Sequence, residues 1–468
     1  MNQPQQHGTS KAVDGMQQRI AEYACSLNYD SLTAEAVHAA KVRIIDILGA
    51  LIGGFFSEPA GIARNLAAQM PNPHGATVIG TRMKTTPDMA AFVNATTGRF
   101  VELMDTYHWP GSHQGHPSDT VTPVLAVAEH VRASGRDFIT AVVLAYEIYL
   151  RMCDAYHNED FDHTNLCCLA TAVASGKLLG LSQAQLSHSI SMAVVPNVIL
   201  RQVRLGHLSM FKAAASGQAG RGGVFAALLA RAGMEGPNLP FEGKAGWFDH
   251  VAHDRFTLEV LGGNGTPFRI PDSQIKNRPA PGVTLSSILA AEKVAPLRNL
   301  KDVRQVTVEV FNYAKDEMGT AEHHWHPDSR ESADHSVPYV VAATLLDGTI
   351  TPHSFNDAHL QNPELRTLLA KIAVVENKEF TAAYERIPQQ HRTRVTVVTA
   401  GDERLVGESG GDEDDLATPK TNAKIEEKFR GLTEDYLGAK RVDAILHQLW
   451  HLEDLADTAQ IPSAFVLA

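Results

Sequence analysis

Apolar residues at three- and four-residue spacings dominate the first part of the chain. The segments at residues 31–54 and 123–135 show this helical periodicity. The pattern predicts a large all-helical domain over residues 16–271, after a flexible tail over residues 1–15. Small residues fill the segments ATAVASGK and AAASGQAGRGG, which predicts helices that approach one another closely.

Helix ends are marked by capping signals. Gly180 follows one apolar periodic segment and predicts its C-terminal end. Helix starts are predicted where a capping residue precedes a proline or forms a capping box, at Thr86 with Pro87, at Thr122 with Pro123, and at Ser182 with Gln185.

The pattern changes after residue 271. Residues 303–311 and 394–400 alternate with period two and are rich in β-branched side chains, which predicts strands. Between them, residues 332–348 predict a helix that ends near Gly348. We therefore expect an α+β lid domain over residues 272–408, inserted before C-terminal helices that complete the helical domain over residues 409–468. The predicted fold class is mostly α with an α+β lid.

Composition narrows the function classes. Of 468 residues, 44% are hydrophobic and 20% are charged, which is typical of a globular protein. A formal net charge of -12 argues against a nucleic-acid partner or an anionic membrane surface. The apolar stretches at residues 47–56 and 139–150 are too short or interrupted to span a bilayer. The four cysteines lack a Cys-x-x-Cys pair and the N-terminal segment lacks an apolar core, so we expect a cytoplasmic protein.

The densest group of polar side chains surrounds a Gly/Pro-rich loop after residue 99. If a helix covers residues 87–107, then Arg99, Glu102 and Thr106 share one face. His116 lies just before the next predicted helix, whose free N–H groups attract a carboxylate. The alternative for Arg99 and Glu102 is an exposed helix end with a surface salt bridge. Loops of this kind often display functional side chains, which favours a site.

Several separated motifs in the chain resemble the MmgE/PrpD family. They are Asp105-Thr106-Tyr107-His108, Gly115-His116-Pro117-Ser118-Asp119, Ala145-Tyr146-Glu147 with Arg151, Arg330-Glu331-Ser332-Ala333-Asp334-His335-Ser336-Val337-Pro338-Tyr339, and Leu345-Leu346-Asp347-Gly348. The resemblance extends over nearly the whole chain. It implies a homodimer whose protomers combine a helical domain with an α+β lid and hold the active site between them. The implied activities are 2-methylcitrate dehydration, cis-aconitate decarboxylation and iminodisuccinate epimerisation.

The resemblance also assigns site residues. By their positions in the family's motifs, the candidate residues are His116, Thr106, Glu102, His163, Lys212, Lys276 and Tyr339. Two departures bear on specificity: Glu102 stands where the family has Asp, and residues 277–282 differ from the Tyr-Pro pair and the Cys or polar residue of many relatives. Taken singly, His163 would be an ordinary surface or hydrogen-bonded histidine, the two lysines would be solvated, and Tyr339 would pack a helix.

The roles follow from the chemistry of a carboxylic acid substrate. Removing water or CO2 beside a carboxylate requires fixed positive charge and a group that transfers a proton near neutral pH. The hypothesis assigns His116, Tyr339 and Glu102 to catalysis, with His116 transferring the proton and Tyr339 as a second donor or an orienting hydroxyl. His163, Lys212, Lys276 and Thr106 are assigned to substrate binding, with Glu102 and Thr106 positioning His116 or the substrate.

Dehydration of 2-methylcitrate or citrate is the first expectation. Decarboxylation of cis-aconitate and epimerisation of iminodisuccinate remain alternatives, as does a non-catalytic carboxylate-binding protein. The histidines at 113, 116, 323, 324 and 326 raise a metallohydrolase alternative, but no acidic residue completes a recognised zinc spacing. The Gly-rich segments match no nucleotide-binding fingerprint. We therefore expect no metal and no cofactor.

Overall fold

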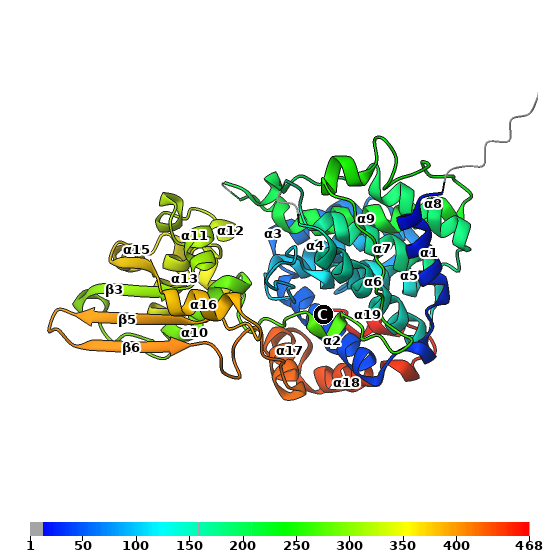
Figure 1. Cartoon of the computed structure of the whole chain (residues 1–468). Coiled ribbons are helices and arrows are strands. Elements are labelled where there is room, and N and C mark those ends of the chain that lie inside the picture. The colour runs from blue at the N-terminus through cyan, green and yellow to red at the C-terminus, as the bar shows by residue number, and fades with distance from the viewer. Residues whose placement is uncertain (1–12, 158–159, 207, 468) are drawn as a thin grey trace, which may run out of the picture.

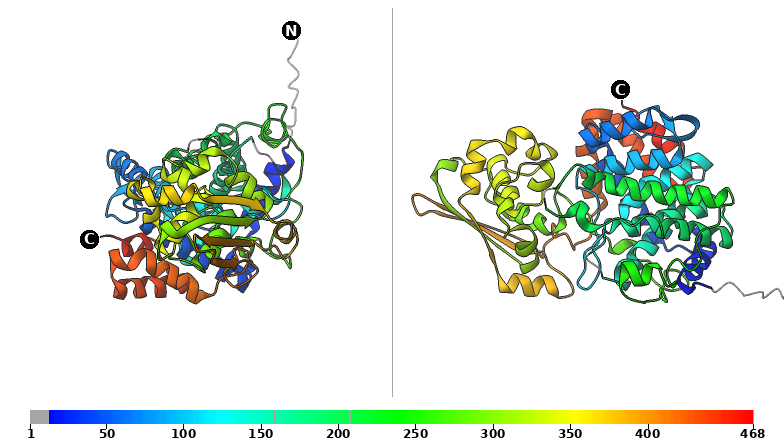
Figure 2. Two further views of the ribbon diagram at one scale, coloured as in Figure 1. Left: turned by 90° about the vertical axis from the view of Figure 1, so that its left-hand side faces the viewer. Right: turned by 90° about the horizontal axis from the view of Figure 1, so that it is seen from above.

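The structure, a computed structural model, describes residues 13–157, 160–206 and 208–467. Figure 1 shows two parts side by side, a large helical domain and a smaller domain built around a sheet. The two further views in Figure 2 show the same division. The fold class predicted from the sequence, mostly α with an α+β part before the C-terminal helices, is confirmed.

The large domain is made of helices from both ends of the described chain. Its core uses apolar side chains between Met16 and Ile275 and again from Ile425 to Phe465. The helices are α1 (Gly15–Ser26), α2 (Ala34–Gly54), α3 (Glu58–Ala67), α4 (Pro87–Phe100), α5 (Val121–Val131), α6 (Gly135–Ala155), α7 (Thr164–Leu178), α8 (Gln183–Val194), α9 (Phe211–Arg231), α17 (Asn422–Leu437), α18 (Ala439–Trp450) and α19 (Gln460–Ala464). A small hairpin of β1 (Pro71–Thr77) and β2 (Lys84–Thr85) joins α3 to α4.

The close helix approach predicted from small residues occurs along α9. A Cβ atom at Gly223 would lie 2.6 Å from the Cys168 carbonyl oxygen of α7. On the other side of α9, a Cβ atom at Gly217 would lie 2.6 Å from the Phe92 carbonyl oxygen of α4. Because only glycine fits these contacts, α9 can pack directly against both neighbouring helices. The N-terminal end of α9, which carries Lys212, is thereby held beside the C-terminal end of α4.

The smaller domain has its own core, formed by apolar side chains between Ala280 and Leu416. Its sheet has the order β4-β3-β5-β6, with β3 parallel to β4 and the other pairs antiparallel. Its elements are α10 (Leu285–Glu292), β3 (Val303–Val310), α11 (Asn312–Met318), α12 (Arg330–Ala333), α13 (Val337–Asp347), α14 (Asp357–Leu360), α15 (Pro363–Leu369), β4 (Ile372–Glu376), α16 (Lys378–Glu385), β5 (Thr393–Thr399) and β6 (Arg404–Ser409).

The strands follow the predicted alternation. On β3, Val306, Val308 and Val310 are buried, which is the expected result of period-two patterning on a sheet with one covered face. The α13 helix ends at Asp347 with Gly348 as its C-cap at φ 95°, as the sequence predicts. Strands β4 and β6 were not predicted, because neither segment carries a clear period-two pattern.

Several local expectations are corrected. Most of the predicted tail, residues 1–12, lies outside the described residues, and Asp14 already caps α1 by accepting a hydrogen bond from Gln17. The helix expected over residues 87–107 ends at Phe100. Thr122 lies inside the first turn of α5 rather than at its cap, because the short helix η2 (Pro117–Thr120) leads directly into α5. Gly180 and the Ser182–Gln185 capping box occur as predicted.

Across the described ranges, no helix combines the length and the apolar character that crossing a membrane would require.

Candidate functional site

A cavity of about 200 Å³ lies where the two domains meet. The large domain contributes Arg99, Glu102, His116 and His163 to its lining, among others. The smaller domain contributes a set that includes Pro281, Gly282, Tyr313 and His335. Side chains far apart in sequence therefore surround one space, which has the size of a small-molecule site rather than a macromolecular interface.

The backbone at Glu102 has an unusual conformation. Two residues after the end of α4, Glu102 has φ 54°, in the left-handed region that non-glycine residues seldom adopt. Such strain persists only where the surroundings fix it, and it clusters at functional sites. The left-handed backbone conformation at Glu102 turns its carboxylate back toward Arg99 in the last turn of α4. Thr106 then lies in an extended segment that pairs with Gln274, rather than on a helix face.

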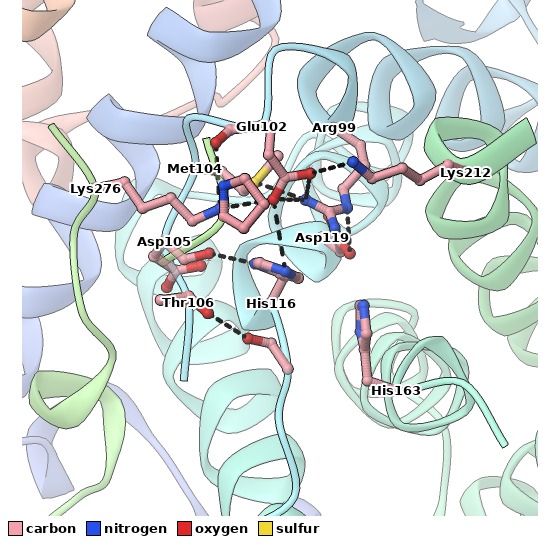
Figure 3. A network of polar contacts seen from close by, with 12 residues as sticks. Arg99, Glu102, Met104, Asp105, Thr106, His116, Asp119, His163, Lys212 and Lys276 are labelled. Atoms are coloured by element: carbon pink, nitrogen blue, oxygen red, sulfur yellow. Dashed lines mark hydrogen bonds and ion pairs between the residues drawn. The ribbon is translucent and has the colours of Figure 1, made fainter. Parts of the chain in front are cut away.

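The Glu102 carboxylate is the centre of a buried cation cluster. Arg99 Nη1 lies 3.0 Å from Oε2, Lys212 Nζ lies 3.2 Å from the same oxygen, and Lys276 Nζ lies 2.7 Å from Oε1. In Figure 3 the two lysines approach the carboxylate from opposite sides. Glu102 is 3% exposed, Lys212 5% and Lys276 0%.

Charge balance decides the ionisation of this cluster. Burial alone would raise the pKa of Glu102, but the charges of Arg99, Lys276 and Lys212 outweigh it and hold that pKa well below its usual range. Burial lowers the pKa of Lys276 to about 8, although the neighbouring Glu102 charge opposes that change. Near neutral pH both members of the Glu102–Lys276 pair are therefore ionised.

A second buried carboxylate supports the cluster. Asp119 Oδ2 lies 3.9 Å from Arg99 Nε and accepts a 2.6 Å hydrogen bond from the Ser216 hydroxyl. Burial raises the pKa of Asp119 to about 6, and the Arg99 charge limits this increase. Arg99 thus lies between two carboxylates, which fixes its guanidinium at the cavity wall.

His116 is held with a defined proton position. Its Nδ1 lies 2.8 Å from the Asp105 carbonyl oxygen, and because a carbonyl only accepts, Nδ1 carries the hydrogen. Burial lowers the pKa of His116 well below its usual value, and the charges of Arg99 and Lys276 add to this effect. The ring is therefore neutral at pH 7 and Nε2 has a free lone pair. Nε2 lies 3.9 Å from Glu102 Oε1, on the side of the cation cluster.

His163 is the N-cap residue of α7 and faces His116, with ring centroids 5.1 Å apart. Its Nδ1 lies 2.9 Å from the Tyr149 hydroxyl oxygen, which also accepts a hydrogen bond from the His116 backbone N–H. His163 Nε2 is buried and makes no hydrogen bond within the described part of the chain. Tyr149 therefore fixes the positions of both histidines, although no pattern in the sequence selects it.

Arg204, another residue that lines the cavity, was also not predicted. In the short helix η3 (Arg201–Arg204), the Arg204 Nε donates a 2.6 Å hydrogen bond to Asp162 Oδ2, and both residues line the cavity. The Arg204 charge holds the pKa of Asp162 below its usual value although burial alone would raise it. No sequence motif predicts Arg204 as a site residue, because its position at the cavity depends on the packing of a loop.

Three predicted site residues do not line the cavity: Lys212, Lys276 and Tyr339. Lys212 contacts two residues that do, Glu102 and His335. Lys276 lies behind Glu102, where its Nζ also donates a 3.2 Å hydrogen bond to the Glu102 carbonyl oxygen. Tyr339 lies in the core of the smaller domain, 1% exposed, and its hydroxyl donates a 2.8 Å hydrogen bond to the Ser354 carbonyl oxygen. Tyr339 is placed there because its side of α13 packs into that core. Thr106 does line the cavity, and its hydroxyl donates to the Gly115 carbonyl oxygen at 3.3 Å.

The smaller domain instead brings His335 to the cavity. Its Nδ1 lies 3.2 Å from Lys212 Nζ and in close contact with Asp334 Oδ1. Lys212 also lies 3.4 Å from Asp334 Oδ1, so Lys212 joins the cluster around Glu102 to the smaller domain. Asp334 and His335 belong to the Asp-His-Ser portion of the motif around Tyr339, and that motif is the signal that could have identified them.

The histidine and acidic side chains bear on the metal alternative. Among the residues that the structure describes, no group of three or more His, Cys, Asp or Glu side chains is arranged to hold a metal ion. His113, three residues before His116 in sequence, stacks on the Tyr156 ring with centroids 5.3 Å apart. The expected metal independence stays a prediction.

Comparisons with known proteins bear on this site. The family model described as MmgE/PrpD N-terminal domain matches residues 18–259, and the MmgE/PrpD C-terminal domain matches residues 279–452. A mitochondrial 2-methylcitrate dehydratase of Yarrowia lipolytica is 26% identical over 85% of this chain and 79% of its own length. The cis-aconitate decarboxylase of Homo sapiens is 26% identical, covering 92% of this chain and 90% of the relative. A 2-methylcitrate dehydratase of Salmonella typhi is 26% identical over 78% of both chains.

Proposed function

The chain belongs to the MmgE/PrpD family, and on that premise we propose that it is a lyase acting on a small di- or tricarboxylic acid, with dehydration of 2-methylcitrate or citrate as its first candidate reaction. The observation that carries the proposal is the orientation of His116. Its Nδ1–H is fixed on a backbone carbonyl oxygen, which leaves an unprotonated Nε2 beside a cavity lined by charged side chains.

The substrate's carboxylates would be held by the cations of the cavity. Arg99 lines the cavity, and Lys212 lies next to it through its contact with Glu102, so these two cations are the candidates for one substrate carboxylate. Each also contacts a further carboxylate, Asp119 in the case of Arg99 and Asp334 in the case of Lys212. Arg204, which also lines the cavity and is paired with Asp162, supplies a guanidinium for a second carboxylate. Guanidinium and ammonium groups are the donors that bind carboxylates most strongly.

His116 Nε2 would act as the general base. In dehydration it takes the proton from the carbon beside the carboxylate, while the electron pair of that C–H bond forms the double bond and the hydroxyl leaves from the next carbon. The negative charge that develops on the carboxylate is stabilised by Arg99 and Lys212. Glu102 orients these cations, and its negative charge stabilises the imidazolium that forms on His116.

The same arrangement serves the second candidate, decarboxylation of cis-aconitate, which the similarity to the human decarboxylase over 92% of this chain supports. Epimerisation of iminodisuccinate also needs a proton moved beside a carboxylate. A carboxylate-binding protein without catalysis is the remaining alternative.

A turnover screen separates these candidates. Citrate, 2-methylcitrate, cis-aconitate and iminodisuccinate would each be incubated with the protein in deuterated water and followed by proton NMR. We expect alkene signals from citrate or 2-methylcitrate. Loss of CO2 from cis-aconitate alone would favour the decarboxylase, and deuterium incorporation without net product would favour the epimerase. Saturable binding without turnover of any of the four acids would reject the lyase proposal.

We also propose a homodimer, located in the cytoplasm. Large apolar side chains on the helical domain support the dimer: Phe56 is 66% exposed and its ring lies 5.3 Å from that of Tyr436, itself 43% exposed. Light scattering on a size-exclusion column would test it, and a single monomeric mass at every concentration would reject it.

A further inference from the structure

The smaller domain supplies one imidazole to the lining of the cavity, that of His335. The other cavity histidines come from the large domain, including the proposed base His116. His335 follows the short helix α12 and precedes α13. The hydroxyl of the next residue, Ser336, caps α13 at Tyr339 N and donates a 2.5 Å hydrogen bond to the His324 carbonyl oxygen. The turn that carries His335 is therefore fixed on both sides.

Asp334 determines which nitrogen of His335 can move a proton. The Asp334 side chain is 2% exposed, and its carboxylate contacts His335 Nδ1 directly. Burial alone would raise the pKa of Asp334, but Lys212 and His335 hold it below its usual value, so Asp334 is a carboxylate that accepts the Nδ1 hydrogen. His335 Nε2 forms no hydrogen bond with the described residues. A carboxylate on Nδ1 and a free Nε2 make an imidazole that gives and takes protons at Nε2.

We propose that His335 is the general acid of the dehydration, protonating the hydroxyl group that leaves the substrate. This inference rests on the proposed function, and it replaces Tyr339 as the proton donor of the smaller domain.

His116 Nε2 takes the C–H proton, the C–H electron pair becomes the second bond of the alkene, and the C–O bond breaks with its electron pair on oxygen. The His335 imidazolium gives its Nε2 proton to that oxygen, and water leaves. His116 then carries the extra proton and His335 is neutral. Exchange with water returns both groups to their starting states, and no other reactant is consumed.

His335 reaches the cavity where the turn after α12 lies against α9, and there Lys212 contacts both Asp334 and His335. The proposed acid and base therefore come from different domains and line the same cavity where those domains meet.

The charges around His335 predict how the reaction depends on pH. Burial and the Lys212 charge hold the pKa of His335 below its usual value, although Asp334 and Glu102 oppose this change. Burial, His323 and His335 together lower the pKa of His324, which lies in the short helix η8 (Glu322–Trp325). Because the acid must be protonated, kcat/KM should fall as the pH rises through the His335 pKa. Removing the Asp334 charge should move this decline to lower pH.

The test compares two leaving groups in matched variants. His335→Gln keeps an amide N–H for Asp334 but cannot protonate a leaving group, and we expect kcat for the hydroxy acid to fall by about 10²–10⁴. On the analogue in which fluorine replaces that hydroxyl, the fluoride leaves without a proton, and the same variant should keep kcat within about tenfold of wild type. The exposed His326 lies in the same domain outside the cavity lining, so His326→Gln is the control.

The outcomes separate the two proposals. If wild type turns over none of the hydroxy acids, the proposed function fails before His335 is tested. If wild type turns over the hydroxy acid and His335→Gln is unimpaired, or loses equal activity on both leaving groups, His335 is not the acid. Asp334→Asn provides a second measurement: the basic limb of kcat/KM should shift to lower pH, and an unshifted limb in a folded variant would contradict the assignment.

Discussion

Lys276 Nζ lies 2.7 Å from Glu102 Oε1, in an ion pair whose lysine side chain has no exposed surface. The family resemblance assigns Lys276 to substrate binding, whereas this contact makes it the buried counter-ion of Glu102. A residue whose charge is balanced inside the protein acts on the substrate through its partner. The role of the pair is then to fix the carboxylate beside His116.

Removing the Glu102 charge should destabilise the protein. In Glu102→Gln, three buried cations lose their shared partner, and breaking a buried ion pair costs about 3–5 kcal/mol. The free energy of unfolding, measured with urea at pH 7, should fall by that amount. The exposed Glu427 of α17 supplies the control, and Glu427→Gln should change stability by less than about 0.5 kcal/mol.

Restoring the family's Asp at this position should behave differently. Glu102→Asp keeps the charge, and Asp adopts the left-handed backbone region more readily than Glu does. We expect near-wild-type stability with an altered KM, because the carboxylate is one methylene shorter. A loss of stability as large as that of Glu102→Gln would show that reach, rather than charge, holds the cluster together.

The reaction should require a neutral His116. Its pKa is lowered by burial and by Arg99, so a base at this position loses activity only when the pH falls well below 6.5. The acidic limb of kcat/KM should therefore lie below pH 6.5, and His116→Gln should lower kcat by about 10²–10⁴. An acidic limb above pH 6.5, or a fully active variant, is inconsistent with His116 as the base.

Tyr339→Phe should affect stability and leave chemistry intact. The variant loses the hydrogen bond to the Ser354 carbonyl oxygen, and leaving that buried acceptor unpaired costs about 1–3 kcal/mol. Turnover of the folded variant should match wild type within about threefold, since catalysis makes no use of a hydroxyl outside the cavity. A kcat decrease of about a hundredfold or more would restore Tyr339 to the catalytic assignment made from the sequence.

Two glycines test helix packing with opposite signs. Gly223→Ala should destabilise the protein by about 1–3 kcal/mol, because the added Cβ would lie 2.6 Å from the Cys168 carbonyl oxygen. Gly431, inside α17, has open space around its Cβ position, and Gly431→Ala should stabilise by about 0.5–1 kcal/mol. Thermal unfolding of the two variants in parallel checks both signs, and equal shifts would contradict the packing described for α9.

Chelator treatment tests metal independence. Protein dialysed against EDTA and analysed for metal content should retain full turnover on the acid that wild type converts. Activity that disappears with EDTA and returns with a single divalent ion would support the metallohydrolase alternative.

The sequence by itself determined the class of fold and most of the local structure. Periodicity, capping residues and glycines specify helices such as α8 and the end of α13 because these signals act over a few neighbouring residues. The family motifs identified His116, His163, Glu102 and Lys212, which the structure brings together.

Tertiary structure alone decided which groups face the cavity. Arg204, Tyr149 and His335 reach the site through contacts between distant segments, and Lys276 and Tyr339 are turned away from it by the same packing. Whether a titratable side chain meets solvent, a counter-ion or a ligand depends on the direction of its Cα–Cβ bond after the domains have packed. Local sequence patterns do not fix that direction.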